Sequence, residues 1–202
     1  MKFQDFYKAL VRKKYYIFSF NDILTFFPKE NKSNLEKRIY TWKKKGWVYS
    51  IKKGLYELTY PQDIIIPDLY IANRLYAPSY ISLETALSYY SIIPEVAMGA
   101  TSITTKPTRK FKNKHGFFSY RTVKPVLFTG YSILEQNGFE VLIAEPEKAL
   151  VDYLYFNKGV DFEEERFEKD VLSKLNRRKL RYYAELCNIN LKRFYAYLRD
   201  ID

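Results

Sequence analysis

Residues 33–46 have the sequence SNLEKRIYTWKKKG, which indicates an amphipathic helix. Leu35, Ile39 and Trp42 follow the i, i+4, i+7 spacing of one helix face, so they are expected to form a buried stripe. The opposite face is polar and basic. A helix of this kind packs on one side and offers hydrogen-bond donors and positive charge on the other.

Both ends of this helix carry sequence signals. Ser33 and Glu36 have the spacing of a capping box, in which each side chain satisfies a backbone N–H of the first turn. Gly46 suits the position just past the last turn, where a left-handed conformation is common. The pattern therefore predicts a helix capped at Ser33 and ended at Gly46.

Shorter elements precede this helix. Apolar residues with helical spacing between Phe3 and Val11 predict a first helix, and a β-prone run follows at residues 15–18. Asn21 is expected to cap a second helix over residues 22–27, which Pro28 ends.

A hairpin follows it. Residues 47–51 and 55–58 predict two strands around Lys52-Lys53-Gly54, which gives the hairpin a basic tip. Three helices and a two-stranded hairpin, in this order, are typical of a winged helix-turn-helix, whose third helix enters the DNA major groove. We expect residues 1–60 to form this DNA-binding domain.

The remaining residues, 61–202, predict a second domain of the α+β class with a helical C-terminal part. Its expected helices cover residues 68–76, 83–90, 147–156, 163–175, 178–187 and 191–198, and its expected strands cover residues 97–106, 116–123, 126–131 and 139–144.

Positive charge is concentrated in the first domain. Residues 1–60 contain 14 Lys and Arg against 5 Asp and Glu, a net charge of +9, whereas the rest of the chain contains 20 against 18, a net of +2. A concentrated positive field attracts a polyanion, and double-stranded DNA is the expected partner. The alternative is a Lys-rich surface that serves only solubility.

The expected DNA contacts lie on the third helix and the hairpin tip. Side chains near the start of the helix are placed to read base edges, and the lysines are placed to bind phosphates. The candidate residues are Ser33, Asn34, Lys37, Arg38, Thr41, Lys44, Lys45, Lys52 and Lys53.

A second basic stretch lies in the other domain, where no acidic residue occurs between Glu95 and Glu135. It is a solvated strand face, a further phosphate contact, or a docking surface for an acidic partner. Its candidate residues are Lys106, Arg109, Lys110, Lys112, Lys114 and Arg121.

The sequence is poor in catalytic groups. His115 is the only histidine and has no carboxylate beside it in the sequence, and Cys187 is the only cysteine. No Gly-rich phosphate loop and no His-Glu-x-x-His pair occurs. We therefore expect a protein that is not an enzyme and that needs no cofactor or metal.

The enzymatic alternative is a metal-dependent nuclease that uses Glu145, Glu147 and Asp152, with Lys148 beside them. Pro146 and Glu147 instead favour the first turn of a helix. The core residues of that helix are expected to be Ala149, Leu150, Tyr153 and Leu154.

The compartment is expected to be the cytoplasm. A single cysteine suits a reducing environment, the first residues lack the apolar region of a secretory signal, and no uncharged apolar stretch is long enough to span a membrane. No membrane partner is expected.

Three motifs resemble the AbiEi antitoxin family of type IV abortive-infection toxin–antitoxin systems. The most specific is PSYISLETALSYYSIIPE at residues 78–95, and VLIAEPEKALVD at residues 141–152 supports it. The third is Gly54-Leu55-Tyr56, which resembles the family's wing. The resemblance extends from the first helix to about residue 160.

The resemblance implies a winged-helix repressor of its own operon. It also implies a second domain that neutralises a nucleotidyltransferase-like toxin without a stable complex. The remaining alternatives are a DNA-binding regulator without an antitoxin role and a protein-interaction scaffold.

Overall fold

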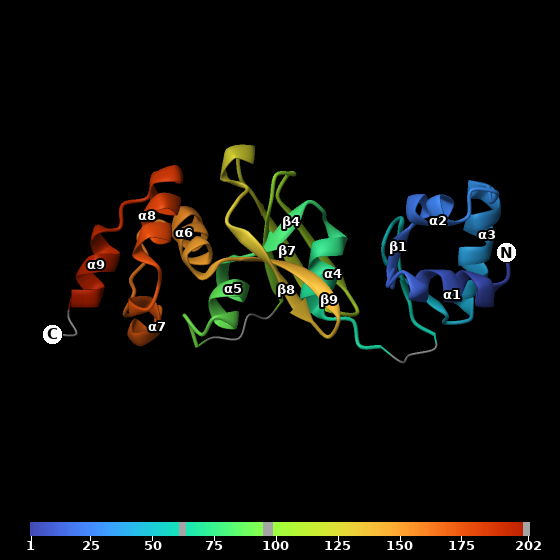
Figure 1. Cartoon of the computed structure of the whole chain (residues 1–202), viewed down its shortest axis with the longest axis horizontal. Helices are drawn as coiled ribbons and strands as arrows, with labels where there is room; N and C mark the ends of the chain where they lie inside the picture. The colour runs from blue at the N-terminus through green and yellow to red at the C-terminus, as the bar shows by residue number, and fades with distance from the viewer. Residues whose placement is uncertain (61–63, 95–98, 200–202) are drawn as a thin grey trace. The chain divides into compact units, whose positions relative to one another are not determined.

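The structure is a computed structural model that describes residues 1–60, 64–94 and 99–199. Within these ranges the chain is a mixed α+β protein with two β-sheets, as the sequence predicts. It divides into two compact units, Met1–Pro67 and Asp68–Asp202 (Figure 1). Within the described ranges, no helix has the length and apolar character needed to cross a membrane.

The first unit combines helices with a small antiparallel sheet of order β1-β3-β2. The pairing places Phe18 of β1 and Ser50 of β2 on either side of Tyr56 in β3. The elements are α1 (Phe3–Arg12), β1 (Ile17–Ser19), α2 (Phe20–Phe26), α3 (Lys32–Lys44), β2 (Val48–Lys52) and β3 (Leu55–Leu58).

The core of the first unit confirms the predicted stripe on α3. Leu35, Ile39 and Trp42 are all buried, with exposed fractions of 0%, 2% and 6%. The ring of Phe6 from α1 lies 4.7 Å from that of Trp42 and 5.2 Å from that of Phe18, measured between centroids. These aromatic contacts fix α3 against α1 and the sheet, so its opposite face is turned outward.

Both predicted N-terminal caps in this unit are wrong. Helix α2 is capped by Ser19, which forms a capping box with Asp22, because the helix already begins at Phe20. Helix α3 is capped by Asn31, whose Oδ1 accepts the N–H of Asn34 at 2.9 Å. Ser33 therefore lies inside the first turn.

The predicted end of α3 is confirmed. Gly46 has a φ of +71°, a conformation that favours glycine. Its N–H donates to the carbonyl of Lys43 at 3.0 Å, and the N–H of Trp47 donates to the carbonyl of Trp42 at 2.9 Å. This pair of bonds is the Schellman motif, which ends the helix and directs the chain into β2.

The second unit contains a six-stranded sheet of order β6-β7-β5-β4-β9-β8. Strand β4 runs parallel to β9, and β5 runs parallel to β7, whereas the other pairs are antiparallel. The strands are β4 (Ser79–Ile81), β5 (Ala100–Thr104), β6 (Arg109–Asn113), β7 (Gly116–Thr122), β8 (Tyr131–Gln136) and β9 (Phe139–Ala144), and the helices are α4 (Asp68–Leu75), α5 (Leu83–Tyr89), the 3-10 turn Pro125–Leu127, α6 (Pro146–Phe156), α7 (Lys169–Ser173), α8 (Arg177–Leu186) and α9 (Lys192–Arg199).

Helices cover both faces of this sheet. On one face, Tyr120 of β7 donates to the carbonyl of Ala72 in α4 at 2.7 Å. On the other face, Thr101 of β5 donates to the carbonyl of Ser82, immediately before α5, at 2.7 Å. Tyr120 is paired with Ser102, the residue after Thr101, and side chains alternate along a strand, so these contacts place α4 and α5 on opposite faces. Helix α6 packs beside α5, and α8 packs on α6.

Several predictions in the second unit need correction. Strands β4, β6 and β8 were not expected, and the strand predicted over residues 126–131 is the 3-10 turn followed by irregular chain. The helix predicted over residues 163–175 is reduced to α7. The strand predicted over residues 97–106 is β5, and residues 97 and 98 fall outside the described residues. Short edge strands with polar side chains give weak periodicity, which explains why β6 and β8 were missed.

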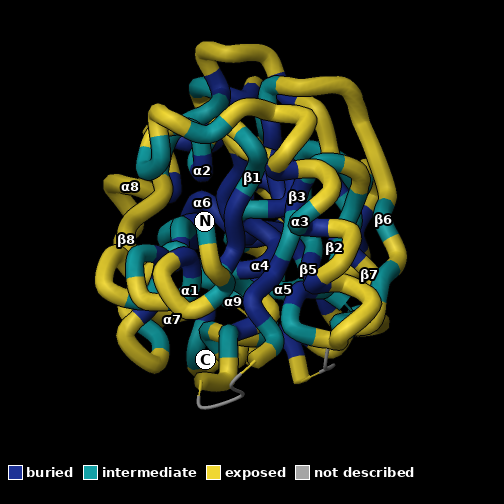
Figure 2. The backbone as a smooth tube through the Cα atoms, turned by 90° about the vertical axis from the view of Figure 1, so that its right-hand side faces the viewer, coloured by how far each residue is buried: buried dark blue, intermediate teal, exposed yellow. Residues whose placement is uncertain are grey.

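Helix α6 confirms the predicted start and half of the predicted core. Pro146 occupies its first turn, and Ala149 and Leu150 are buried, whereas Tyr153 and Leu154 are only half-buried. The buried face instead includes charged residues, because α6 lies between α5 and α8. Figure 2 shows this buried part of the helix in dark blue.

Candidate nucleic-acid interface

Helix α3 presents an exposed polar face. Ser33, Asn34, Lys37 and Lys44 are all exposed on the side opposite the buried stripe. Tyr40 lies among them with 59% of its surface exposed, and the Lys44 ammonium lies 4.8 Å from its ring centroid. Tyr40 is not among the DNA contacts expected from the sequence. Its place on the polar side of the helical pattern could have indicated that it is exposed on this face.

Two of the expected contacts on α3 have partners within the unit. Arg38 is half-buried, donates to the Met1 carbonyl and lies 3.9 Å from a carboxylate oxygen of Glu30. The Thr41 hydroxyl donates to the Lys37 carbonyl at 3.0 Å. The guanidinium of Arg38 therefore ties α3 to the start of the chain, and the other residues form the outward face.

The β2–β3 hairpin carries the remaining basic residues. Lys52 is half-buried at the end of β2, and Lys53 is exposed at the tip, where Gly54 turns the chain with a φ of +80°. Lys45, just after α3, places its ammonium 4.6 Å from the ring centroid of Trp47.

The second basic stretch is split between the two faces of the sheet. Lys106 donates to the carbonyl of Ala77 at 2.5 Å and lies over Tyr76, on the side of α4. Lys110 and Arg121 line a hollow on the opposite side, beside the start of α5. The stretch therefore does not form one continuous surface.

The other residues of the second basic stretch are also divided between the two faces of the sheet. The Arg109 guanidinium lies 5.8 Å from the Phe111 ring, which packs against Tyr76. Lys112 lies over Phe117 on the other face, with 4.8 Å between its ammonium and the ring centroid. Lys114 lies in the turn between β6 and β7.

The two longest motifs of the sequence meet in a buried polar cluster. Tyr80 and Ser82 donate to one carboxylate oxygen of Asp152, at 3.0 and 2.8 Å. Lys148 pairs with the other oxygen and donates to the Tyr80 hydroxyl at 3.0 Å. All four side chains are essentially inaccessible to solvent.

Burial governs the protonation of this cluster. It raises the pKa of Asp152, while the charge of Lys148 and the three hydrogen bonds act in the opposite direction. Burial, together with the neighbouring carboxylate, also raises the pKa of Tyr80, so the phenol keeps its proton and remains a donor. The cluster joins β4 to α6 across 68 to 72 residues of sequence.

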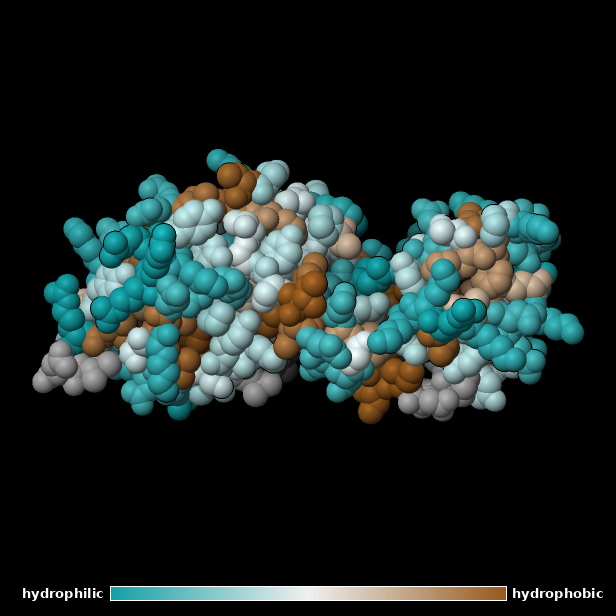
Figure 3. Space-filling view, in the orientation of Figure 1, coloured by the Kyte–Doolittle hydropathy of each residue, from teal (hydrophilic) through white to brown (hydrophobic). Residues whose placement is uncertain are grey.

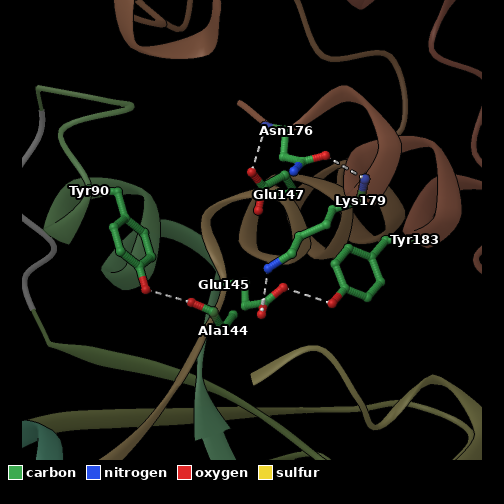
Figure 4. Close-up of polar contacts among 7 residues, drawn as sticks. All are labelled: Tyr90, Ala144, Glu145, Glu147, Asn176, Lys179 and Tyr183. Atoms are coloured by element: carbon green, nitrogen blue, oxygen red, sulfur yellow. Dashed lines mark hydrogen bonds and ion pairs between the residues drawn. The ribbon is translucent and has the colours of Figure 1, made fainter. Parts of the chain in front are cut away.

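A further hydrogen bond, outside the buried cluster, joins the same two motifs. The Tyr90 hydroxyl donates to the Ala144 carbonyl at 2.9 Å (Figure 4). Burial raises the pKa of Tyr90 to about 12. The end of α5 is thereby fixed to the end of β9.

The acidic residues of the nuclease alternative have separate partners. Glu145 accepts from Lys179 at 2.9 Å and from Tyr183 at 2.8 Å, and Glu147 accepts from the backbone N–H of Asn176 at 2.7 Å (Figure 4). Asp152 belongs to the buried cluster. Within the described ranges, no three His, Cys, Asp or Glu side chains gather in a way that suits a metal ion.

Glu145 is held in its charged form. Burial acts to raise its pKa, but the hydrogen bonds from Lys179 and Tyr183, together with the Lys179 charge, outweigh burial and lower it. The hydrogen bond between Lys179 and Glu145 also raises the pKa of Lys179. The two residues form an ion pair between α8 and the start of α6.

His115 lies near a carboxylate that is distant in the sequence. His115 Nδ1 lies 3.8 Å from Asp68 Oδ1 at the start of α4.

Cys187 is buried, and burial raises the pKa of its thiol, with Lys148 and Asp152 close enough to affect its charge.

Comparison of the chain with models of known protein families and with curated proteins found no match.

Proposed function

We propose that the first unit is a winged helix-turn-helix that binds double-stranded DNA, and that the protein represses its own operon. The observation that carries this proposal is the exposed polar and basic face of α3, opposite the buried stripe. The antiparallel sheet β1-β3-β2 and the β2–β3 hairpin supply the wing.

The residues of the outward face of α3 have two kinds of role in this proposal. Ser33 and Asn34 lie at the N-terminal end of α3, from which side chains reach base edges in the major groove. Lys37 and Lys44 bind phosphates, and Tyr40 lies beside Lys44 and contacts the sugar-phosphate backbone. Phosphate contacts position the protein, while base contacts select the sequence.

The charge distribution supports the same partner. The net charge of +9 within residues 1–60 makes this unit the favoured site for a polyanion. The wing lysines, Lys52 and Lys53, are long flexible cations, which suit phosphates better than bases.

We also propose that the second unit is an antitoxin against a nucleotidyltransferase-like toxin. The motif resemblance supports this role, and exposed apolar side chains on this unit supply contacts for a protein partner. Ile133, on the edge strand β8, is 63% exposed, and Val126 in the 3-10 turn is 66% exposed. Figure 3 shows an apolar patch over that turn.

The first test measures binding to the DNA upstream of the gene as a function of salt. Replacing both wing lysines (Lys52→Ala with Lys53→Ala) removes two phosphate contacts, so the slope of log affinity against log salt flattens by roughly 1.8 units. The affinity falls by the same factor for every DNA sequence, because phosphate contacts do not depend on the bases. The matched control is Lys8→Ala with Arg12→Ala, which removes two exposed charges from α1. Equal losses in both variants would show that net charge, and not the wing, governs binding.

The second test separates repression from rescue. Any nucleotidyltransferase-like protein encoded beside this gene is expressed together with full-length variants. Lys37→Ala with Lys44→Ala abolishes repression and still restores growth, whereas Ile133→Asp represses and no longer restores growth. If no neighbouring protein is toxic, the antitoxin role is withdrawn and the DNA-binding proposal stands.

We propose a binding role and no catalytic one. Purified protein with Mg²⁺ or Mn²⁺ leaves plasmid DNA intact. Cleavage that disappears in Glu147→Gln would instead promote the nuclease alternative.

A further inference from the structure

A groove runs between α5 and the face of the second sheet that α5 covers, and one end of it reaches the start of α4. It consists of two adjoining hollows, each with a volume of about 410 to 420 Å³. Both hollows include Phe117 and Phe118 of β7 and Gly99 and Ala100 at the start of β5. Helix α5 forms the opposite wall. A hollow of this size suits a small ligand.

One half of the groove is aromatic. Tyr89 at the end of α5 and Phe117 on β7 both line it, and they are 46% and 54% exposed. Exposed rings on two walls of one hollow are suited to stacking against a flat, unsaturated ring. His115 and Asp68 lie at the end of this half and offer polar contacts to such a ring.

The other half is basic. Lys110 on β6 and Arg121 on β7 line it together with Ser119 and Thr101. The carboxylate in the lining of this half is Glu84, on the α5 wall. A phosphate therefore fits on the β6–β7 side, where the two cations lie, and sugar hydroxyls fit beside Glu84.

The strand register fixes the spacing between the two halves. One face of β7 carries every second residue, which are Phe117, Ser119 and Arg121. Lys110 on β6 is the cross-strand neighbour of Ser119. Residues two apart on a strand are separated by about 6.6 Å. Phe117 and the Lys110–Ser119 pair therefore occupy neighbouring positions on one face of the sheet, so a base at Phe117 would have its own phosphate on the side of Lys110 and Arg121.

We propose that this groove binds a nucleotide unit, with an unstacked base between Tyr89 and Phe117 and a phosphate on Lys110 and Arg121. The unit is either a free nucleotide or one residue of a single strand. A duplex does not suit this groove, because its bases are already stacked on both faces. The site is independent of the DNA interface on α3.

The experiment uses the full-length protein carrying Lys37→Ala and Lys44→Ala, so that the α3 interface is weakened. Binding of ATP is measured by calorimetry, and binding of a fluorescein-labelled U10 RNA is measured by anisotropy. Phe117→Ala weakens binding about tenfold, the loss of one stacked base. Lys110→Ala with Arg121→Ala lowers the salt slope for the RNA by roughly 1.4 units.

Two matched controls keep the result specific. Lys106→Ala with Arg109→Ala removes two charges from the same stretch on the α4 side, and Tyr182→Ala removes an exposed aromatic ring from α8. Both controls bind as the parent does. Circular dichroism melting curves must be the same for all variants.

The two ligands distinguish the source of the nucleotide. Similar affinity for ATP and for the RNA supports a free nucleotide, and much tighter binding of the RNA supports a single strand. No binding of either ligand overturns the proposal, as does an equal loss in the groove variants and their controls.

Discussion

The Lys148–Asp152 pair is a buried ion pair between two residues one turn apart on α6. Both residues are almost completely buried, with exposed fractions of 0% and 1%. A charged pair in such a site is sustained only if its remaining hydrogen-bonding groups are satisfied, and Tyr80 and Ser82 supply those bonds. The pair therefore depends on β4 being in place.

Removal of one partner is predicted to be far more harmful than removal of both. Lys148→Met leaves the carboxyl group of Asp152 buried without its cation, which costs about 3–5 kcal/mol of the free energy of unfolding. Lys148→Met combined with Asp152→Asn recovers much of that loss, because no charge stays buried and the amide oxygen still accepts from Tyr80 and Ser82. Urea unfolding measures both values. A double variant as unstable as the single one would contradict this account.

The sequence could not reveal this cluster. A lysine and an aspartate four residues apart on a helix are ordinarily an exposed pair. Their burial depends on Tyr80 and Ser82, about 70 residues earlier, which only the sheet brings alongside. The exposed residues of α3, in contrast, followed from helical spacing alone.

The start of α6 and the helix α8 are joined by an ion pair with a defined pH response. The pKa of Glu145 is lowered in the folded protein from its ordinary value of 4.5. Its stabilising effect is therefore fully present above that value and is lost as the pH falls through the folded pKa.

We predict that Glu145→Gln is less stable than the parent protein at pH 7, and that the difference shrinks as the pH falls below 4.5. The measurement is the free energy of unfolding between pH 3 and pH 7. The control is Glu140→Gln, an exposed residue of β9. A difference that does not change with pH would show that the hydrogen bond from Tyr183 matters and the charge does not.

Elements were predictable from the sequence to the extent that their own residues determine them. Helix α3 and the β2–β3 hairpin have a strong periodicity of apolar residues. Gly46 marks the end of the helix, and Gly54 marks the turn of the hairpin. The cap of α3 was misplaced because Asn31 and Ser33 are both good caps, and backbone geometry decides between them. Strand β4, three residues long, exists because β5 and β9 flank it, and so no local pattern predicted it.

The two compact units predict that damage to one leaves the function of the other intact. Lys148→Met lies in the second unit, so its effect on unfolding should appear as an earlier step in guanidinium. The affinity of the first unit for DNA should not change below that step. Intrinsic fluorescence reports on the first unit, since Trp42 and Trp47 are the only tryptophans of the chain. A shift of the tryptophan transition in Lys148→Met would show that the units unfold together.

The position of β4 has a consequence for synthesis on the ribosome. The strand is buried along its whole length, and one of its two neighbours, β9, is made about 60 residues later. At ordinary elongation rates this interval lasts roughly 3–12 s, during which one edge of β4 has no strand to pair with. An unpaired apolar edge is a template for aggregation. Translational pausing between the codons for residues 104 and 139 would prolong that exposure, whereas a pause before codon 68 would hold a chain whose first unit is already made.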